Sequence, residues 1–229
     1  MRLAASTAAA LTLALAGPSW AERPLATEDA DVLDRGECEW ESYAARESVS
    51  GAPSARTLST QIGCGVGAMP QAALAYGRSR FDGETTPGWA LVGKTALLPR
   101  EGGGLGLTLA WGLGWQRMPG SSWRHEDSAL NLVATRTFAD RFTAHANLGW
   151  SRSESERRNT TTWNTALEWS ATDRLDLMGE VYGDDRARPW LGVGARYAIS
   201  ERLTVDASWT VQNNTPRPKL LTVGVKVGF

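Results

Sequence analysis

The residues of this sequence that could do chemistry are scattered, and none has the spacing of a catalytic or metal-binding motif. The two histidines, His125 and His145, lie in no ligand-spaced pattern with the two cysteines. Ser128, Ser151 and Ser170 could act as nucleophiles, but no spacing places a base within reach of them. The sequence therefore predicts no catalytic residue, no metal site and no cofactor.

The charge balance excludes another large class of functions. The chain has 24 Lys and Arg residues against 25 Asp and Glu residues, a formal net charge of −1. Proteins that bind nucleic acid neutralise phosphates with basic runs or basic domains, and this sequence contains neither. We therefore expect no nucleic-acid partner.

The first residues have the features of a secretory signal peptide. Arg2 precedes an apolar stretch over residues 3–16, and small residues stand three and one positions before a cut after Ala21. The apolar stretch is too short for a membrane-spanning helix. We expect residues 1–21 to be removed on export, and the alternative is a buried N-terminal helix.

The segment after the expected cut, residues 22–35, is polar and precedes the first predicted strand. It contains four acids, namely Glu28, Asp29, Asp31 and Asp34. It could enter the fold as a plug, or it could be a disordered periplasmic tail, because chain termini are commonly disordered. The sequence leaves both possibilities open.

Residues 36–229 show apolar side chains at every second position, the pattern of β-strands. In the stretch 105–116, Leu and Trp alternate with Gly, Thr, Ala and Gln, and the stretches 142–151, 161–170, 203–211 and 221–229 repeat the pattern. These segments run about ten residues, the length that a tilted transmembrane strand requires. Eleven Trp residues, many near strand ends on the apolar face, resemble an aromatic girdle.

Connections of two lengths alternate along the chain. Residues 138–142, 171–175 and 199–203 share a small-acid-Arg-apolar turn, and 67–70 and 99–104 occupy equivalent places. Longer polar connections lie between them at 47–55, 81–87, 117–127, 152–158, 183–188 and 213–218. Short periplasmic turns and longer external loops are typical of outer-membrane barrels. The sequence predicts an all-β, antiparallel transmembrane β-barrel of about 12 strands, with both termini on the periplasmic side.

The two cysteines fit the first hairpin of this barrel. If the hairpin is symmetric about Gly51, the numbers of paired residues sum to 102, as those of Cys38 and Cys64 do. Cross-strand neighbours on one face come within bridging distance, and the periplasm is oxidising. We predict a disulfide between them, with two free buried thiols as the alternative.

The alternation also predicts which charged side chains face the lumen. A symmetric turn around Thr172 would place Glu168 opposite Asp176, and we hypothesise that this pair forms a constriction with Lys94 or Arg196. The alternative is a salt-bridge lattice that holds the wall together. Closure of the barrel should bring Lys226 near Glu37 or Glu39. The lumen and ligand candidates are Glu41, Lys94, His145, Glu168, Asp176, Arg196 and Asp206.

Two N-terminal motifs carry a family resemblance. The run Arg23-Pro24-Leu25-Ala26-Thr27-Glu28-Asp29-Ala30 and the strand Gly36-Glu37-Cys38-Glu39-Trp40-Glu41-Ser42, followed by a second Cys-bearing strand, are similar to outer-membrane proteins of the meta-pathway phenol-degradation family. That resemblance implies a barrel over the remaining length and uptake of aromatic or other hydrophobic compounds.

The sequence as a whole predicts a non-enzymatic protein of the bacterial outer membrane. We expect a narrow channel or uptake protein for small molecules, aromatic or hydrophobic ones among them. The alternatives are an outer-membrane hydrolase and a structural or adhesive barrel that acts through its external loops. The expected partners are membrane lipids, a small solute and the barrel-assembly machinery, which would recognise the final strand ending in Phe229.

Overall fold

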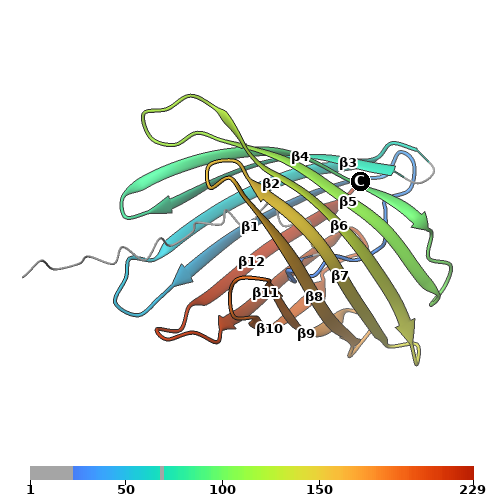
Figure 1. Ribbon diagram of the computed structural model, residues 1–229. Helices are drawn as coiled ribbons and strands as arrows, with labels where there is room; N and C mark the ends of the chain where they lie inside the picture. Colours follow the sequence, from blue (N-terminus) through green and yellow to red (C-terminus); the bar gives the residue numbers. More distant parts are fainter. Residues whose placement is uncertain (1–22, 68–69) are drawn as a thin grey trace, which may run out of the picture.

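The computed structural model describes residues 23–67 and 70–229, which form one closed barrel of twelve antiparallel strands (Figure 1). The predicted signal peptide, residues 1–21, lies outside the described residues. The strands are β1 Cys38–Ser48, β2 Ala55–Gly65, β3 Pro70–Phe81, β4 Glu84–Leu98, β5 Leu105–Gln116, β6 Arg124–Phe138, β7 Phe142–Ser153, β8 Arg158–Ser170, β9 Leu175–Asp184, β10 Trp190–Ala198, β11 Leu203–Gln212 and β12 Lys219–Gly228.

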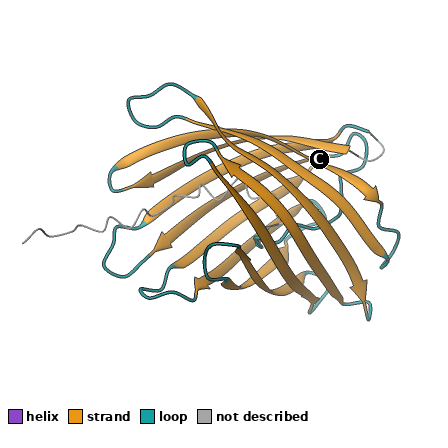
Figure 2. Ribbon diagram, in the orientation of Figure 1, coloured by secondary structure: helices purple, strands orange, loops and turns teal. Residues whose placement is uncertain are grey.

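Each strand pairs with its neighbours in the chain, and β12 pairs with β1 to close the barrel. The described part of the chain consists of strands joined by loops and turns (Figure 2). It contains no helix long and apolar enough to cross a membrane, a finding that bears on helices alone. The predicted fold class and strand number are confirmed.

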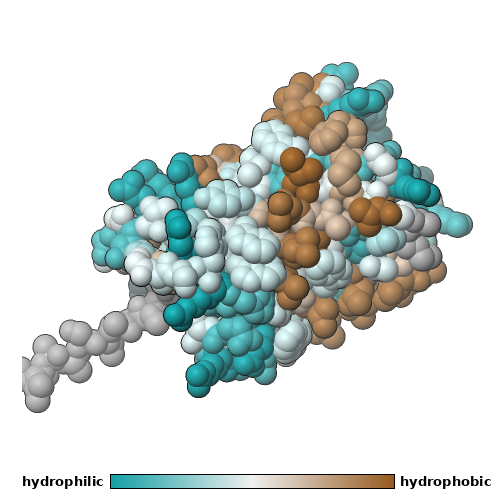
Figure 3. Space-filling model, turned by 90° about the horizontal axis from the view of Figure 1, so that it is seen from above, coloured by the Kyte–Doolittle hydropathy of each residue, from teal (hydrophilic) through white to brown (hydrophobic). Residues whose placement is uncertain are grey.

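The period-two pattern separates two faces of the wall. Large apolar side chains are exposed on the outer face, including Leu74, Leu148 and Val193 at about 60% exposure each. Residues at the alternate strand positions, such as Thr108 of β5 and Val133 and Thr135 of β6, are almost fully buried on the inside. In Figure 3 apolar residues gather over the wall, and the end at the left, which carries the longer connections, is mostly hydrophilic. An apolar outer face with a polar interior is the arrangement of a transmembrane barrel.

The first hairpin has the predicted register. Cys38 lies opposite Cys64, and the two form a disulfide with a Cα–Cα distance of 4.1 Å. Gly51, at the centre of the hairpin, has a φ of 82°, a conformation that glycine adopts without steric cost. The disulfide joins the first residue of β1 to the penultimate residue of β2, at the end of the hairpin away from Gly51.

Two connections differ from the sequence-based expectation. The long loop expected at 81–87 is a two-residue turn of Asp82 and Gly83, whose φ angles of 47° and 86° match a type I′ hairpin. Both strands continue up to this turn, so β4 includes Pro87. The turn between β8 and β9 is centred on Asp173 and not on Thr172, because Ser170 pairs with Asp176.

Candidate functional site in the lumen

Residues 23–35, called the inner segment here, lie inside the barrel. Arg23 contacts Asp206 of β11, Ala26 and Thr27 contact Glu180 of β9, and Glu28 contacts Asn147 of β7. Further along, Ala30 contacts Thr135 of β6, Asp29 contacts Lys94 of β4, Leu33 contacts Gln71 of β3, and Arg35 bridges to Gly65 of β2. The inner segment thus follows the inside of the wall from β11 to β2.

Lumen side chains satisfy the backbone of the inner segment. The carboxylate of Glu180 accepts hydrogen bonds from the N–H groups of Ala26 and Thr27 at 2.9 and 3.0 Å, and from the Thr27 hydroxyl at 2.9 Å. Asn147 accepts from the Glu28 N–H at 2.7 Å and donates to the Glu28 carbonyl at 2.9 Å. A buried peptide group without a partner is costly, so these contacts allow irregular backbone to be buried in the lumen.

Charge pairs hold the inner segment at its start and in its middle. Near its start, Arg23 donates to Asp206 at 2.9 Å and lies over the ring of Tyr43, 4.2 Å from the ring centroid. In its middle, the Lys94 ammonium pairs with Asp29 at 2.8 Å and with Glu28, and donates to the Asp29 and Asp31 carbonyls. Lys94 is 8% exposed and Glu28 1% exposed, so removal of either partner would leave an uncompensated buried charge.

Small residues on the inner wall make room for the inner segment. A Cβ atom added to Gly194 of β10 would lie 3.0 Å from Cγ of Pro24, and one added to Gly106 of β5 would lie 3.3 Å from Cβ of Ala30. The guanidinium of Arg23 lies against Gly224 of β12 in the same way. Glycine at these strand positions therefore permits the close approach of side chains of the inner segment.

A second polar cluster lies around Arg196 of β10. The Arg196 guanidinium contacts Glu168 at 2.5 Å and Asp176 at 3.4 Å. His145 lies 3.6 Å from the same Glu168 carboxylate and 3.0 Å from the Thr135 hydroxyl. The predicted group of Glu168, Asp176 and Arg196 is thus brought together.

The predicted pairing of β8 with β9, which placed Glu168 opposite Asp176, is wrong by two residues. Glu168 lies opposite Met178, and Asp176 lies opposite Ser170 on one side and Arg196 on the other. Arg196 meets both carboxylates because it reaches across β9 to β8. Lys94 takes no part in this cluster, since it is paired with the inner segment.

The remaining candidates also lie on the inner face. Asp206 is the partner of Arg23, and Glu41 accepts a hydrogen bond from Gln61 at 2.8 Å. Lys226 meets Glu39 at 4.0 Å, as the predicted closure between β12 and β1 requires. The structure therefore places all seven candidates in the lumen.

A cavity of about 150 Å³ lies between the inner segment and the wall made by β12 and β1–β4. Five carboxylates and two lysines are among the residues that line it, together with Gln61, Gln71 and apolar groups. The charged lining residues are Glu28, Asp29, Asp31, Glu39, Glu41, Lys94 and Lys226. This is a small polar space with an excess of negative groups.

One serine–histidine contact lies away from the lumen clusters. The Ser128 hydroxyl lies 3.2 Å from Nε2 of His125, where β6 is bulged against β5. No carboxylate in residues 23–67 and 70–229 forms a hydrogen bond with the other ring nitrogen. A hydrolytic triad uses such a group to orient the histidine.

The closed barrel, its apolar outer wall and its polar lumen define a transmembrane β-barrel of the outer-membrane class. Residues 9–229 match the family described as uncharacterised conserved protein UCP029691, and the chain belongs to that family. No curated protein matches the sequence.

Solved structures of outer-membrane barrels have the same fold. The KdgM porin in complex with disordered oligogalacturonate is 9% identical, with a TM-score of 0.62 over 82% of this chain and 99% of the porin. The NanC porin is 8% identical, with a TM-score of 0.59 over 82% of this chain and 98% of the other. The toluene transporter TbuX of Ralstonia pickettii is 8% identical, with a TM-score of 0.52 over 86% and 90%. At sequence identities of 8–9%, this structural similarity establishes the fold of the chain and nothing further.

The partners of the inner segment were not apparent from the sequence. Glu180 and Asn147 were recognisable as polar groups on inward positions, but their partners lie 154 and 119 residues away. The available signal was glycine at inward positions, such as Gly194 and Gly224, where the wall of an empty barrel would not need to leave room for another segment.

Proposed function

We propose that this protein is an outer-membrane channel for small polar solutes, and that the inner segment restricts its lumen. The observation that carries the proposal is the path of residues 23–35 around the inside of the wall, which leaves a cavity of about 150 Å³ beside it. A space of this size accommodates a few water molecules or a small solute, and not a polymer.

The charge of the cavity supports a preference for cations. Its lining contains five carboxylates and two lysines, and Lys94 is already paired with Glu28 and Asp29. A lumen lined by an excess of one charge concentrates ions of the opposite sign, because the low-dielectric wall focuses the field. The family resemblance would imply an aromatic solute, but these lining groups favour a polar one.

The test is the reversal potential of the full mature chain in a planar bilayer with a salt gradient. We expect cation selectivity that weakens in Glu41→Gln, because Glu41 borders the cavity. Glu201→Gln is the matched control, since Glu201 is exposed in the turn between β10 and β11. An anion-selective or unselective current in the unmodified protein would contradict the proposal.

Passage of solutes is tested separately by swelling of liposomes that contain the protein. Small cationic and neutral polar solutes should enter faster than anionic solutes of the same size, and oligosaccharides should be excluded. Equal rates for all sizes would show that the inner segment does not restrict the lumen.

A hydrolase is the second candidate function, and only the Ser128–His125 contact favours it. Its test is ester hydrolysis by the folded barrel in detergent. Activity that disappears in both Ser128→Ala and His125→Ala would establish it, and we expect no activity above the level of those variants.

We also propose that the barrel-assembly machinery recognises the final strand. Phe229 is 61% exposed at its end, and its backbone exchanges two hydrogen bonds with Cys38 as the barrel closes. We expect Phe229→Ala to lower the yield of inserted barrel in cells while leaving refolding in detergent unchanged. An equal loss in both settings would mean that Phe229 acts only in folding.

A further inference from the structure

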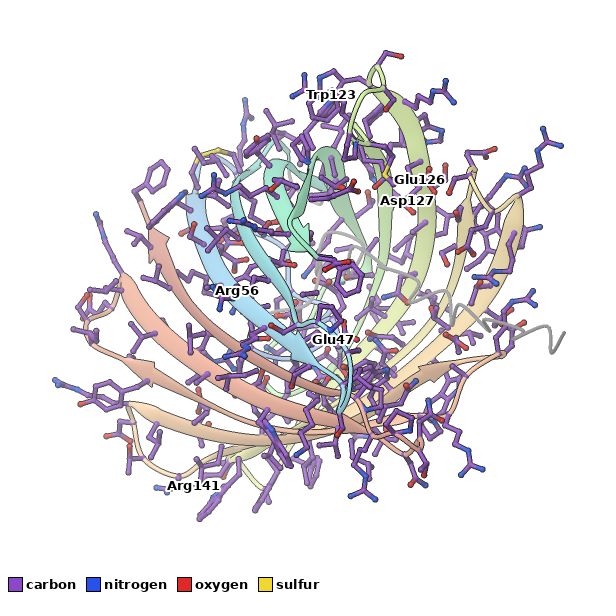
Figure 4. The ribbon with its side chains drawn as sticks, turned by 90° about the vertical axis from the view of Figure 1, so that its left-hand side faces the viewer. Glu47, Arg56, Trp123, Glu126, Asp127 and Arg141 are labelled. Carbon is purple, nitrogen blue, oxygen red and sulfur yellow. A yellow bond between two sulfur atoms is a disulfide. The ribbon has the colours of Figure 1, made fainter. Side chains whose placement is uncertain are left out.

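Four arginines form a cluster on the outer surface, away from the lumen. Arg46 of β1, Arg56 of β2, and Arg78 and Arg80 of β3 are all exposed, and each lies near the end of its strand that carries the longer connections. The cluster defined by these four residues is called the rim cluster. Figure 4, viewed from this end of the barrel, labels Arg56 on β2 and Glu47 on the neighbouring strand.

The rim cluster faces outward and not into the lumen. Arg56 shares the alternation of Leu58 and Ile62, which are 48% and 53% exposed on the outer wall. Arg78 and Arg80 continue the series of Leu74 and Tyr76, which are 60% and 50% exposed. The cluster is therefore a direct continuation of the apolar surface toward the rim.

The register places like charges side by side. Arg46 lies directly opposite Arg56, and Arg56 lies directly opposite Arg80. Directly opposed residues of an antiparallel pair have Cβ atoms about 4.5–5.5 Å apart, and like charges at such positions destabilise the sheet. Three guanidinium groups in one cross-strand row therefore require a compensating anion to be favourable.

Residues 23–67 and 70–229 do not supply that anion. None of the four guanidinium groups forms an ion pair or a side-chain hydrogen bond with another described residue, in contrast to those of Arg23, Arg100 and Arg196 on the inside. The neighbouring carboxylate Glu47 lies at an alternate position of β1, opposite Ala55, so it belongs to the other face of the sheet. The charge of the rim cluster is thus available to a group outside the protein.

We propose that the rim cluster binds the phosphate groups of a phosphorylated glycolipid in the external leaflet of the outer membrane. Arginine binds phosphate through two parallel hydrogen bonds, and several arginines at a membrane interface are a recognition site for anionic lipid headgroups. Leu58, Leu74 and Tyr76 lie below the cluster on the same face, where the acyl chains of that lipid would pack. A free anion in water would make no contact with this adjoining apolar surface.

The proposal is independent of what passes through the lumen. It depends on the fold being embedded in the membrane with its longer connections outside, which is the usual orientation of such barrels. A protein without conductance could therefore still bind the lipid, and a variant that does not bind the lipid could still conduct ions.

The experiment measures thermal unfolding of the full mature barrel in detergent during titration with bis-phosphorylated lipid A. The test variant replaces Arg46, Arg56, Arg78 and Arg80 with Gln. The matched control replaces four exposed arginines at the opposite end, Arg136, Arg141, Arg174 and Arg202, with Gln. Dephosphorylated lipid A and inorganic phosphate are titrated in parallel.

Phosphorylated lipid A should raise the unfolding temperature of the unmodified protein and of the control variant. The rim variant should require at least a tenfold higher lipid concentration for the same shift. Without lipid it should unfold at the same temperature as the unmodified protein or higher, because repulsion across the strands has been removed.

Three results would overturn the proposal. The rim variant could keep its response to phosphorylated lipid A, which would place the binding site elsewhere. Dephosphorylated lipid A could give an equal shift, which would make the contact apolar. Inorganic phosphate could reproduce the shift at the same concentration, which would make the cluster a site for a free anion and not for a lipid.

Discussion

The outer wall and the lumen are two faces of the same twelve strands, and they depend on different forces. The outer wall presents side chains such as Leu74 and Leu148 to lipid, where packing is non-directional and one apolar group can replace another. The lumen contains paired groups such as Lys94 with Asp29 and Arg23 with Asp206, whose contribution depends on having both partners. We therefore expect the outer wall to tolerate exchange of one apolar residue for another. In the lumen, a substitution should be tolerated only if the partner of the replaced group keeps a compensating contact.

The largest effect should come from breaking the lumen pair at Lys94. Lys94→Met leaves Glu28 and Asp29 buried without their cation, and loss of one partner of a buried pair costs about 3–5 kcal/mol. The inner segment should then leave the wall, and hydrogen exchange at residues 26–30 should rise while the strands stay protected. Lys219→Met, at an exposed position, is the control and should change neither. Unchanged protection of the inner segment would mean that Lys94 does not hold it.

The next effect concerns the outer wall. Leu148 lies near the middle of β7 and is 61% exposed, so Leu148→Arg should place a charge near the centre of the bilayer and lower stability by about 2–4 kcal/mol. Leu148→Phe should cost much less, because the apolar character is kept. Urea unfolding of the barrel from lipid vesicles measures both. Equal stability of the two variants would contradict the lipid-facing assignment.

A smaller effect tests the coupling between Arg23 and Asp206. In a double-mutant cycle with Arg23→Gln and Asp206→Asn, we expect an interaction free energy of roughly 0.5–3 kcal/mol for docking of the inner segment, because the two groups are in contact. Hydrogen exchange of the inner segment provides the free energies. Additive effects of the two substitutions would show that the 2.9 Å contact contributes little.

The outer wall was predictable because side-chain direction has a period of two in any strand. That rule correctly assigned the faces of β5, β7 and β12, and symmetry about Gly51 correctly paired Cys38 with Cys64. The rule does not fix the centre of a turn. The hydroxyl of Thr172 accepts hydrogen bonds from the N–H groups of Arg174 and Leu175, and this turn shifted the pairing of β8 and β9 by two residues from the prediction.

The site was less predictable than the wall. Alternation places Glu180 and Lys94 in the lumen, but it does not say what lies across from them. Whether residues 22–35 form a tail or a plug depends on contacts such as that between Thr27 and Glu180, which neither local propensity nor periodicity encodes. The four acids of the segment are visible in the sequence. That Lys94 pairs with two of them, Glu28 and Asp29, is seen only in the folded structure.

The most direct test of the central claim is single-channel conductance of the chain with and without residues 23–33. If the inner segment restricts the lumen, the deletion should give a larger conductance and weaker cation selectivity, because Glu28, Asp29 and Asp31 leave the cavity lining. Deletion of residues 119–122 from the β5–β6 loop is the control and should leave the conductance unchanged. Equal conductance of the full chain and the chain without residues 23–33, with both barrels folded, would contradict the account.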